Sequence, residues 1–427
     1  MDRGRGGRRE STACYPRSVN RLRRLVPLFG LVALASVAAT ELLPAKVSEF
    51  AREVEAVRGR KFAHPVAAGE IDSQELRTTL RAKLAESFPA SPEETRRTLV
   101  ALGLIEDNPE LMDRLVDFYA SQVIAFYDPE PRRFFVVRGA QTALDGEALQ
   151  GAAEKLIFTH ELTHALQDQA LDLDRKIRAL KDDGDRALAL QCLLEGEATL
   201  VMVRAALADL PGADESIEEQ LAPLLSPGAL EKANAPRGVP DYFVQQLFLP
   251  YVEGTAYVRR AVKDHGWKEV DRLWNSPPLS TAEILHPEPR PAPAADLLPK
   301  RSGDLAPAAF RPLYSDTIGE WGIRFLLRRG LDESDADAAA AAWRGDRIAF
   351  FAAPDGAIAY FWRIRLDADV SAERFESAFE KARRKNPSAR AETTRRSGRD
   401  VVVACGLPAG AQAAPEAPGR TGAAREP

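Results

Sequence analysis

Apolar residues recur at helical spacing through most of the first 290 residues. This pattern predicts helices over 72–89, 91–102, 109–124, 145–170, 186–209 and 241–275. In the second of these, Ser91 is placed as an N-cap, Glu94 follows three residues later, and Gly103 comes after the last turn. β-Favouring runs at 125–127 and 134–137 predict a short hairpin. This part of the chain is therefore expected to be mostly helical with a small sheet.

The pattern changes after a proline-rich stretch at 287–299. Two β-rich runs on either side of 354–356 predict a second hairpin, and helices are expected over 316–329 and 371–384. The Arg-Gly-Asp triplet at 344–346 lies between an alanine-rich helix and a strand, and it is predicted to be a turn. The C-terminal part is thus expected to mix strands and helices.

Together these patterns predict an α+β protein, with a mostly helical domain that contains a small β-sheet and a smaller C-terminal α/β module. The predicted divisions are an N-terminal segment 1–39, a linker 40–64, the helical domain 65–290, a proline-rich linker 291–304, the module 305–405, and a disordered tail 406–427.

The N-terminal segment has the layout of an export signal. Residues 1–24 contain eight arginines, and 25–39 are apolar without a charge. A basic leader followed by a short apolar run and small residues is typical of a secretory signal peptide. An uncleaved N-terminal anchor is the alternative. We therefore expect an exported protein (periplasmic, cell-surface or secreted), with possible membrane association through this segment.

The remaining chain is acidic. Removal of 1–39 takes away eight basic and two acidic residues and changes the formal net charge from −5 to −11. An acidic chain without a basic patch is not expected to bind nucleic acid. Two distant cysteines, Cys192 and Cys405, remain and do not make a disulfide framework.

The stretch "HELTH" contains two of the five histidines of the chain, inside the predicted helix 145–170. Residues four apart lie on one helix face about 5–6 Å from each other, so His160 and His164 can bind one ion. Glu161 is rotated about 100° from His160 and reaches the edge of such a site. This spacing suits a zinc peptidase, in which the carboxylate takes a proton from the water molecule that the metal activates.

A catalytic zinc ion takes three protein ligands and leaves one position for water. The helix predicted over 186–209 offers two carboxylates, Glu195 and Glu197, among apolar residues. A carboxylate in such a helix is costly to bury unless it is paired or bound to metal. Either residue could supply the third ligand, and one Zn²⁺ is the expected cofactor.

"HELTHALQD", followed by a helix with "EGEA", resembles the gluzincin metallopeptidases, the thermolysin-like and aminopeptidase-like zincins. The resemblance covers 120–210 and implies a zincin-like metallopeptidase domain at 65–290, with Glu195 as the third ligand and a peptide or protein as substrate. It also implies that the strand 134–137 is an edge strand that pairs with substrate. The chain departs from compact members in having 30 residues between His164 and Glu195, of which the insert 172–186 is expected to form an extra charged helix or loop.

Gluzincins stabilise the oxyanion with a histidine or tyrosine from a later part of the chain. The resemblance therefore implies His286, Tyr251 or Tyr257 as the donor. Asp168 could orient an imidazole or be a solvated charge at the helix end. If Glu197 is not a ligand, it could support a ligand or face the substrate.

These observations predict a zinc metallopeptidase that hydrolyses peptide bonds, with Glu161 as the general base. His160, His164 and Glu195 would hold the metal, and His286 or Tyr251 would assist catalysis. The alternative is an exported surface protein with a binding or structural role and a non-catalytic zinc site. The intact Glu161 favours the enzyme, because a structural site has no use for a base.

Overall fold

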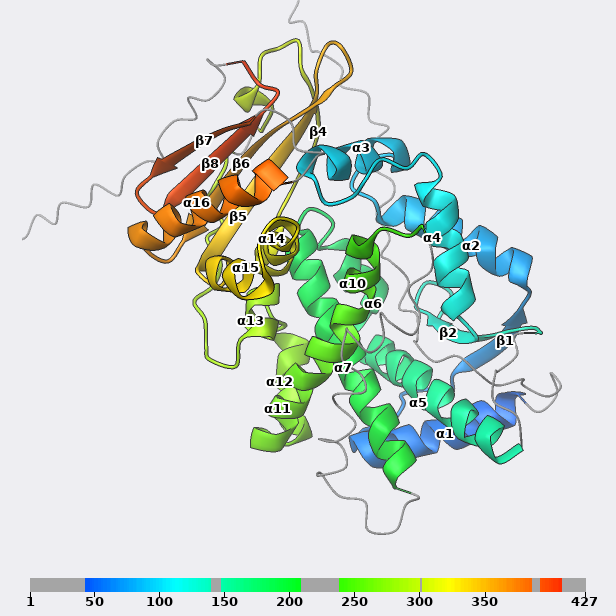
Figure 1. The fold of residues 1–427 in the computed structure, drawn as a ribbon. Helices are drawn as coiled ribbons and strands as arrows, with labels where there is room; N and C mark the ends of the chain where they lie inside the picture. The colour runs from blue at the N-terminus through cyan, green and yellow to red at the C-terminus, as the bar shows by residue number, and fades with distance from the viewer. Residues whose placement is uncertain (1–42, 140–146, 209–237, 300–301, 386–391, 409–427) are drawn as a thin grey trace, which may run out of the picture.

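A computed structural model describes residues 43–139, 147–208, 238–299, 302–385 and 392–408 (Figure 1). The predicted α+β class is confirmed, since most described residues are helical and two sheets accompany the helices. The predicted signal segment 1–39 lies outside the described residues, as does most of the predicted tail. None of the described helices is long and apolar enough to cross a membrane.

The predicted helix 241–275 is divided into four helical elements, whereas the other predicted helices begin and end within about three residues of the predicted positions. In chain order the described helices are α1 (Leu43–Arg58), α2 (Ser73–Ser87), α3 (Pro92–Leu102), α4 (Leu111–Gln122), α5 (Glu147–Leu171), α6 (Leu173–Arg178), α7 (Gly184–Leu207), α10 (Asp241–Leu249), the π-helix η2 (Pro250–Gly254), α11 (Thr255–His265), α12 (Trp267–Asn275), α13 (Thr281–Leu285), the 3-10 helix η3 (Ser302–Leu305), α14 (Gly319–Arg328), α15 (Glu333–Ala340) and α16 (Asp369–Lys385).

Local signals account for several of these boundaries. Ser91 accepts a hydrogen bond from the Glu94 backbone N–H, and the Glu94 side chain accepts one from the Ser91 backbone N–H. Gly103 ends α3 in the left-handed conformation, with φ of 80°. The predicted extra helix between His164 and Glu195 is α6, which begins directly after α5.

The small sheet has the order β1-β3-β2. It consists of β1 (Ala67–Ile71), β2 (Ala125–Asp128) and β3 (Arg133–Val137). The predicted hairpin of β2 and β3 is confirmed. The expectation that 134–137 forms an edge strand is wrong, because β1 pairs in parallel with the other side of β3. β2 is the edge strand that lies against α5, the helix that contains His160 and His164.

α5 and α7 pack side by side at the centre of the helical part, and α1 lies against both (Figure 1). α7 is buried along most of its length, as its apolar sequence predicts. α1 falls within the predicted linker 40–64 and buries Leu43, Val47, Val54 and Arg58. This segment is therefore packed into the helical core.

The C-terminal sheet is antiparallel, with the order β4-β5-β6-β8-β7. Its strands are β4 (Arg311–Asp316), β5 (Trp343–Ala352), β6 (Ile358–Leu366), β7 (Glu392–Ser397) and β8 (Asp400–Cys405). Alternate residues separate its two faces. Phe350 and Trp362 belong to the cluster shared with α14, α15 and α16, whereas Phe351 and Phe361 pack with Leu305 and the proline-rich segment.

The first of these clusters also contains residues of α2 and α4, so the C-terminal sheet and the helical part share a hydrophobic core. The division at 291–304 stays a prediction.

The Arg-Gly-Asp triplet does not form the predicted turn. Asp346 is a buried residue of β5, which pairs with β6 through this region. Its carboxylate accepts four N–H groups, from the backbone of Ile318 and Gly319 and from the indoles of Trp343 and Trp362. The bonds from Ile318 and Gly319 tie the start of α14 to the sheet, and the sequence pattern contains no sign of them.

We predict that Asp346→Asn destabilises the fold despite its nearly identical shape. An amide accepts through one oxygen only, so two of the four buried donors lose their partner, at about 1–3 kcal/mol each. Urea unfolding should show this loss. Asp355→Asn is the control, because Asp355 is exposed in a turn and accepts one bond that asparagine can keep. Equal unfolding midpoints for the two variants would contradict the prediction.

Candidate metal centre

Helices α5 and α7 bring three predicted ligands together. His160 and His164 project from α5 toward Glu195 on α7, and all three side chains are buried. The His160 Nε2 atom lies 3.1 Å from Glu195 Oε2 and 3.2 Å from His164 Nε2. His164 Nε2 lies 3.4 Å from the same carboxylate oxygen. Glu195, and not Glu197, is the carboxylate that meets the imidazoles.

The three facing atoms form a nearly equilateral triangle. Zinc bonds of about 2.0–2.1 Å in a tetrahedral arrangement place neighbouring donor atoms about 3.3–3.4 Å apart. Two imidazole nitrogens and one carboxylate oxygen are also a donor set that catalytic zinc sites use, with one position left for water. The His160, His164 and Glu195 side chains could therefore hold one metal ion.

The electrostatics of the His160, His164 and Glu195 side chains, here called the triad, favour a positive charge at its centre. Burial lowers the pKa of His164, but the facing Glu195 carboxylate outweighs this effect and raises the pKa to about 9. Burial raises the pKa of Glu195, but the two imidazoles lower it to about 2. At His160 burial is the larger effect, and its pKa falls below the ordinary value. The carboxylate thus stays ionised beside a cation, which is a proton or a metal ion.

Glu161 lies beside the triad and is fully buried. Its Oε2 atom accepts a hydrogen bond of 2.9 Å from the backbone N–H of Tyr127, in the edge strand β2. The Glu161 charge contributes to the raised pKa values of both His164 and Tyr251. The carboxylate is therefore close to the centre without being one of the three atoms of the triangle.

Asp168 has neither of the two roles considered for it. Its carboxylate accepts the hydroxyl of Tyr127 at 2.8 Å and the backbone N–H of Leu173 at 2.8 Å. It thereby anchors β2 to α5 and caps the start of α6. Because the same strand contacts Glu161, Asp168 supports the base indirectly.

Tyr251 reaches the centre from the π-helix η2. Its ring stacks on the His160 ring, with 5.8 Å between centroids. Burial, followed by the charges of Glu195 and Glu161, raises the Tyr251 pKa well above its ordinary value. The hydroxyl therefore keeps its proton and can donate a hydrogen bond at the centre.

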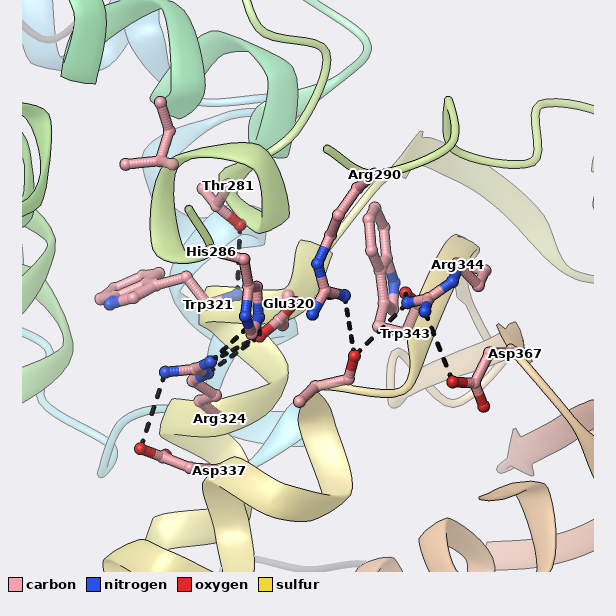
Figure 2. Close-up of polar contacts among 12 residues, drawn as sticks. Thr281, His286, Arg290, Glu320, Trp321, Arg324, Asp337, Trp343, Arg344 and Asp367 are labelled. Carbon is pink, nitrogen blue, oxygen red and sulfur yellow. Dashed lines mark hydrogen bonds and ion pairs between the residues drawn. The ribbon is translucent and has the colours of Figure 1, made fainter. Parts of the chain in front are cut away.

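His286 lies elsewhere, at the junction of α13 and α14. Figure 2 shows its ring pointing toward Glu320 and Arg324, and His286 Nε2 lies 2.7 Å from Glu320 Oε1. Within the described part of the chain, its ring forms its polar contacts with these two residues and not with the triad. Tyr257 packs among apolar side chains of α7, α11 and α12. Of the three predicted oxyanion donors, the structure brings only Tyr251 to the centre.

A contact between two glycines lets η2 approach the centre. A Cβ atom on Gly196 would overlap the backbone of Gly254, and one on Gly254 would overlap the backbone of Cys192. α7 and η2 therefore pack backbone to backbone, and π-turns of this kind are frequent at functional sites. The glycine between Glu195 and Glu197 thus allows Tyr251 to stand over His160.

Three residues that surround the triad were not predicted from the sequence. Gln167 contacts His164, Tyr127 contacts Glu161, and Arg58 contacts Glu197. The spacing of three between His164 and Gln167 is a usable signal, because it places both on one helix face. Arg58 lies 139 residues from Glu197 and gives no local signal.

Comparisons with known proteins concern mainly the other end of the chain. The family model described as "Domain of unknown function (DUF8575)" matches residues 310–417, about a quarter of the chain, and does not include the metal centre. No curated protein and no solved structure gives a significant match. The resemblance of 120–210 to gluzincins therefore stays a prediction.

We predict that two glycine-to-alanine changes have opposite effects. Gly196→Ala should destabilise the protein by about 1–3 kcal/mol or more and disturb zinc binding, because its methyl group meets the Gly254 backbone. Gly151→Ala on α5 should stabilise by about 0.5–1 kcal/mol, because nothing lies near its Cβ position. Thermal unfolding with and without zinc measures both effects. A neutral Gly196→Ala would show that the helices can separate freely.

Proposed function

We propose that the chain is an exported zinc metallopeptidase, with His160, His164 and Glu195 as ligands of one Zn²⁺. The observation that carries the proposal is the triangle of three buried donor atoms with a separate carboxylate, Glu161, beside it. The substrate would be a peptide or protein. Export is inferred from the basic and apolar composition of 1–39.

His160, His164 and Glu195 would hold the ion, and a Zn²⁺ ion bound there would supply polarisation of the substrate carbonyl and a lowered pKa, about 7, for its bound water. In this proposal Glu161 would accept the proton of the water molecule that attacks the peptide carbonyl. The same carboxyl group can then transfer this proton to the amide nitrogen as the C–N bond breaks. Its bond from the Tyr127 N–H orients the carboxylate, which is what a general base requires.

Tyr251 is the better supported oxyanion donor. Its hydroxyl stays protonated, its ring stacks on a ligand, and η2 fixes its position against α7. A donor that is already in place when charge develops on the carbonyl oxygen stabilises the transition state without reorganisation. His286 pairs with Glu320 instead.

A non-catalytic zinc site in a binding or structural protein is the alternative function. The burial of all three ligands favours it, because structural zinc sites are closed. A structural site, however, normally has four protein ligands, and the described residues bring three candidate ligands together here. The two functions differ in what Glu161 should do.

We predict that Glu161→Gln keeps zinc and loses proteolysis. The amide is isosteric but cannot accept a proton, so cleavage of an unfolded casein-like substrate should fall by at least about 10²-fold. Metal analysis should still find zinc in this variant. Glu195→Ala is the control that loses the ion. If the wild type binds zinc but cleaves nothing in a broad peptide library, the alternative function is favoured.

We predict that Tyr251→Phe lowers kcat by about 10²–10³-fold and leaves the zinc content unchanged, because it removes one donor to the oxyanion. Steady-state kinetics and metal analysis measure the two effects. His286→Gln should leave kcat unchanged, since His286 contacts Glu320 and not the triad. The reverse result would transfer the donor role from Tyr251 to His286.

A further inference from the structure

A buried chain of polar side chains runs from the ligand His164 to helix α1. His164 Nδ1 lies 2.9 Å from Gln167 Oε1, and Gln167 Nε2 donates to Glu197 Oε2 at 2.9 Å. The Glu197 carboxylate also accepts the Arg58 Nε–H at 2.5 Å and the Trp274 indole N–H at 2.7 Å. All members except the ligand lie outside the triad.

The hydrogen-bond chemistry of this chain fixes the proton on His164. Gln167 Nε2 faces the Glu197 carboxylate and the Leu194 carbonyl oxygen, and both groups can only accept. The amide nitrogen must therefore point at them, and its oxygen must point at His164. An amide oxygen only accepts, so Nδ1 of His164 carries the proton. In the neutral ring the lone pair is then on Nε2, the atom that faces Glu195.

Arg58 pairs with the Glu197 carboxylate and holds it in place. Its guanidinium lies 4.8 Å from the ring centroid of Trp267 and 4.9 Å from that of Trp274, and it also pairs with Asp271 at 2.7 Å. Glu197 is fully buried, so without Arg58 its charge would be costly. The ion pair and the two indoles hold this end of the chain rigid.

We propose that Gln167, Glu197 and Arg58 are positioning residues for the metal ligand His164. They fix its tautomer and ring orientation so that Nε2 is presented to the ion. This inference rests on the zinc site of the proposed function, but not on peptidase activity. It also makes α1 a structural part of the centre, since Arg58 is the last residue of that helix.

Zinc affinity is the first measurement, by competition with a chromophoric chelator at fixed pH. Gln167→Met has nearly the same size but offers no acceptor to Nδ1, and it should bind zinc about 10–100-fold more weakly than the wild type, as is typical for loss of such a partner. Gln169→Met is the matched control. Gln169 lies on the same helix and bonds to His64 and Ala63, away from the triad. The Gln169→Met variant should therefore bind zinc as tightly as the wild type.

Glu197→Gln tests whether this chain of hydrogen bonds determines which ring nitrogen of His164 carries the proton. Glutamine at 197 replaces one carboxylate oxygen with an N–H group, so the Leu194 carbonyl oxygen is the one acceptor that still holds the Gln167 nitrogen. Molecules in which the Gln167 amide is turned over and the ring proton of His164 lies on Nε2 then become populated. Nitrogen-15 NMR of the five histidines in the zinc-free protein, above the pKa of His164, should then show that tautomer, and zinc affinity should fall. A change that affects only packing would lower stability without moving the proton.

The outcomes separate the two proposals. If the wild type binds zinc tightly, and Gln167→Met and Glu197→Gln bind it equally well with the tautomer unchanged, the positioning role is overturned while the peptidase proposal stands. If the wild type binds no zinc, the proposed function itself fails. Should Gln167→Met not fold, Arg58→Lys is the substitute, because it keeps the charge but loses the Nε–H bond, and an unchanged affinity there also overturns the role.

Discussion

The centre of this protein depends on three electron-pair donors held against one another in the apolar interface of α5 and α7. Two imidazole nitrogens and a carboxylate oxygen, 3.1–3.4 Å apart and shielded from water, repel one another unless a cation lies among them. A proton on His164 meets this need in the metal-free state. A divalent ion meets it more fully, because it bonds to all three atoms at once.

Three consecutive residues of α7 serve three different neighbours. Successive helix residues point about 100° apart, so Glu195 and Glu197 face directions that differ by about 200°. Glu195 meets the imidazoles, Gly196 meets the backbone of η2, and Glu197 meets Arg58. The "EGEA" sequence is thus explained by three contacts, of which only one is to the metal site. A larger residue at 196 would move Tyr251, and a neutral residue at 197 would leave the Gln167 nitrogen with the Leu194 carbonyl oxygen as its one remaining acceptor.

The sequence predicted what local patterns determine. The paired histidines, the capped helix α3 and both hairpins follow from spacing and turn residues. The apolar helix with two carboxylates left Glu195 and Glu197 open as the third ligand, and the resemblance to gluzincins favoured Glu195. Contacts between residues far apart in the sequence could not be predicted from these local patterns. Strand β1 joins β3 from more than 60 positions away, which makes 134–137 a central strand. Asp346 gains three of its four donors from the start of α14 and from β6. The role of Arg58 was missed for the same reason: its partner Glu197 lies 139 residues away, and the segment around Arg58 was predicted to be a linker.

The two helices that supply ligands are anchored by segments that lie far apart along the described chain. α5 is held through Gln167, Glu197 and Arg58 by α1, whereas the start of α7 is held by α13 and the C-terminal sheet. There Asp185 accepts the backbone N–H and hydroxyl of Thr281, and Asp316 of β4 accepts the Gly184 N–H. Binding energy gained only in the folded state stabilises every contact on which the site depends. An ion between α5 and α7 therefore stabilises the packing of α1 and of the C-terminal sheet together, although neither contributes a ligand.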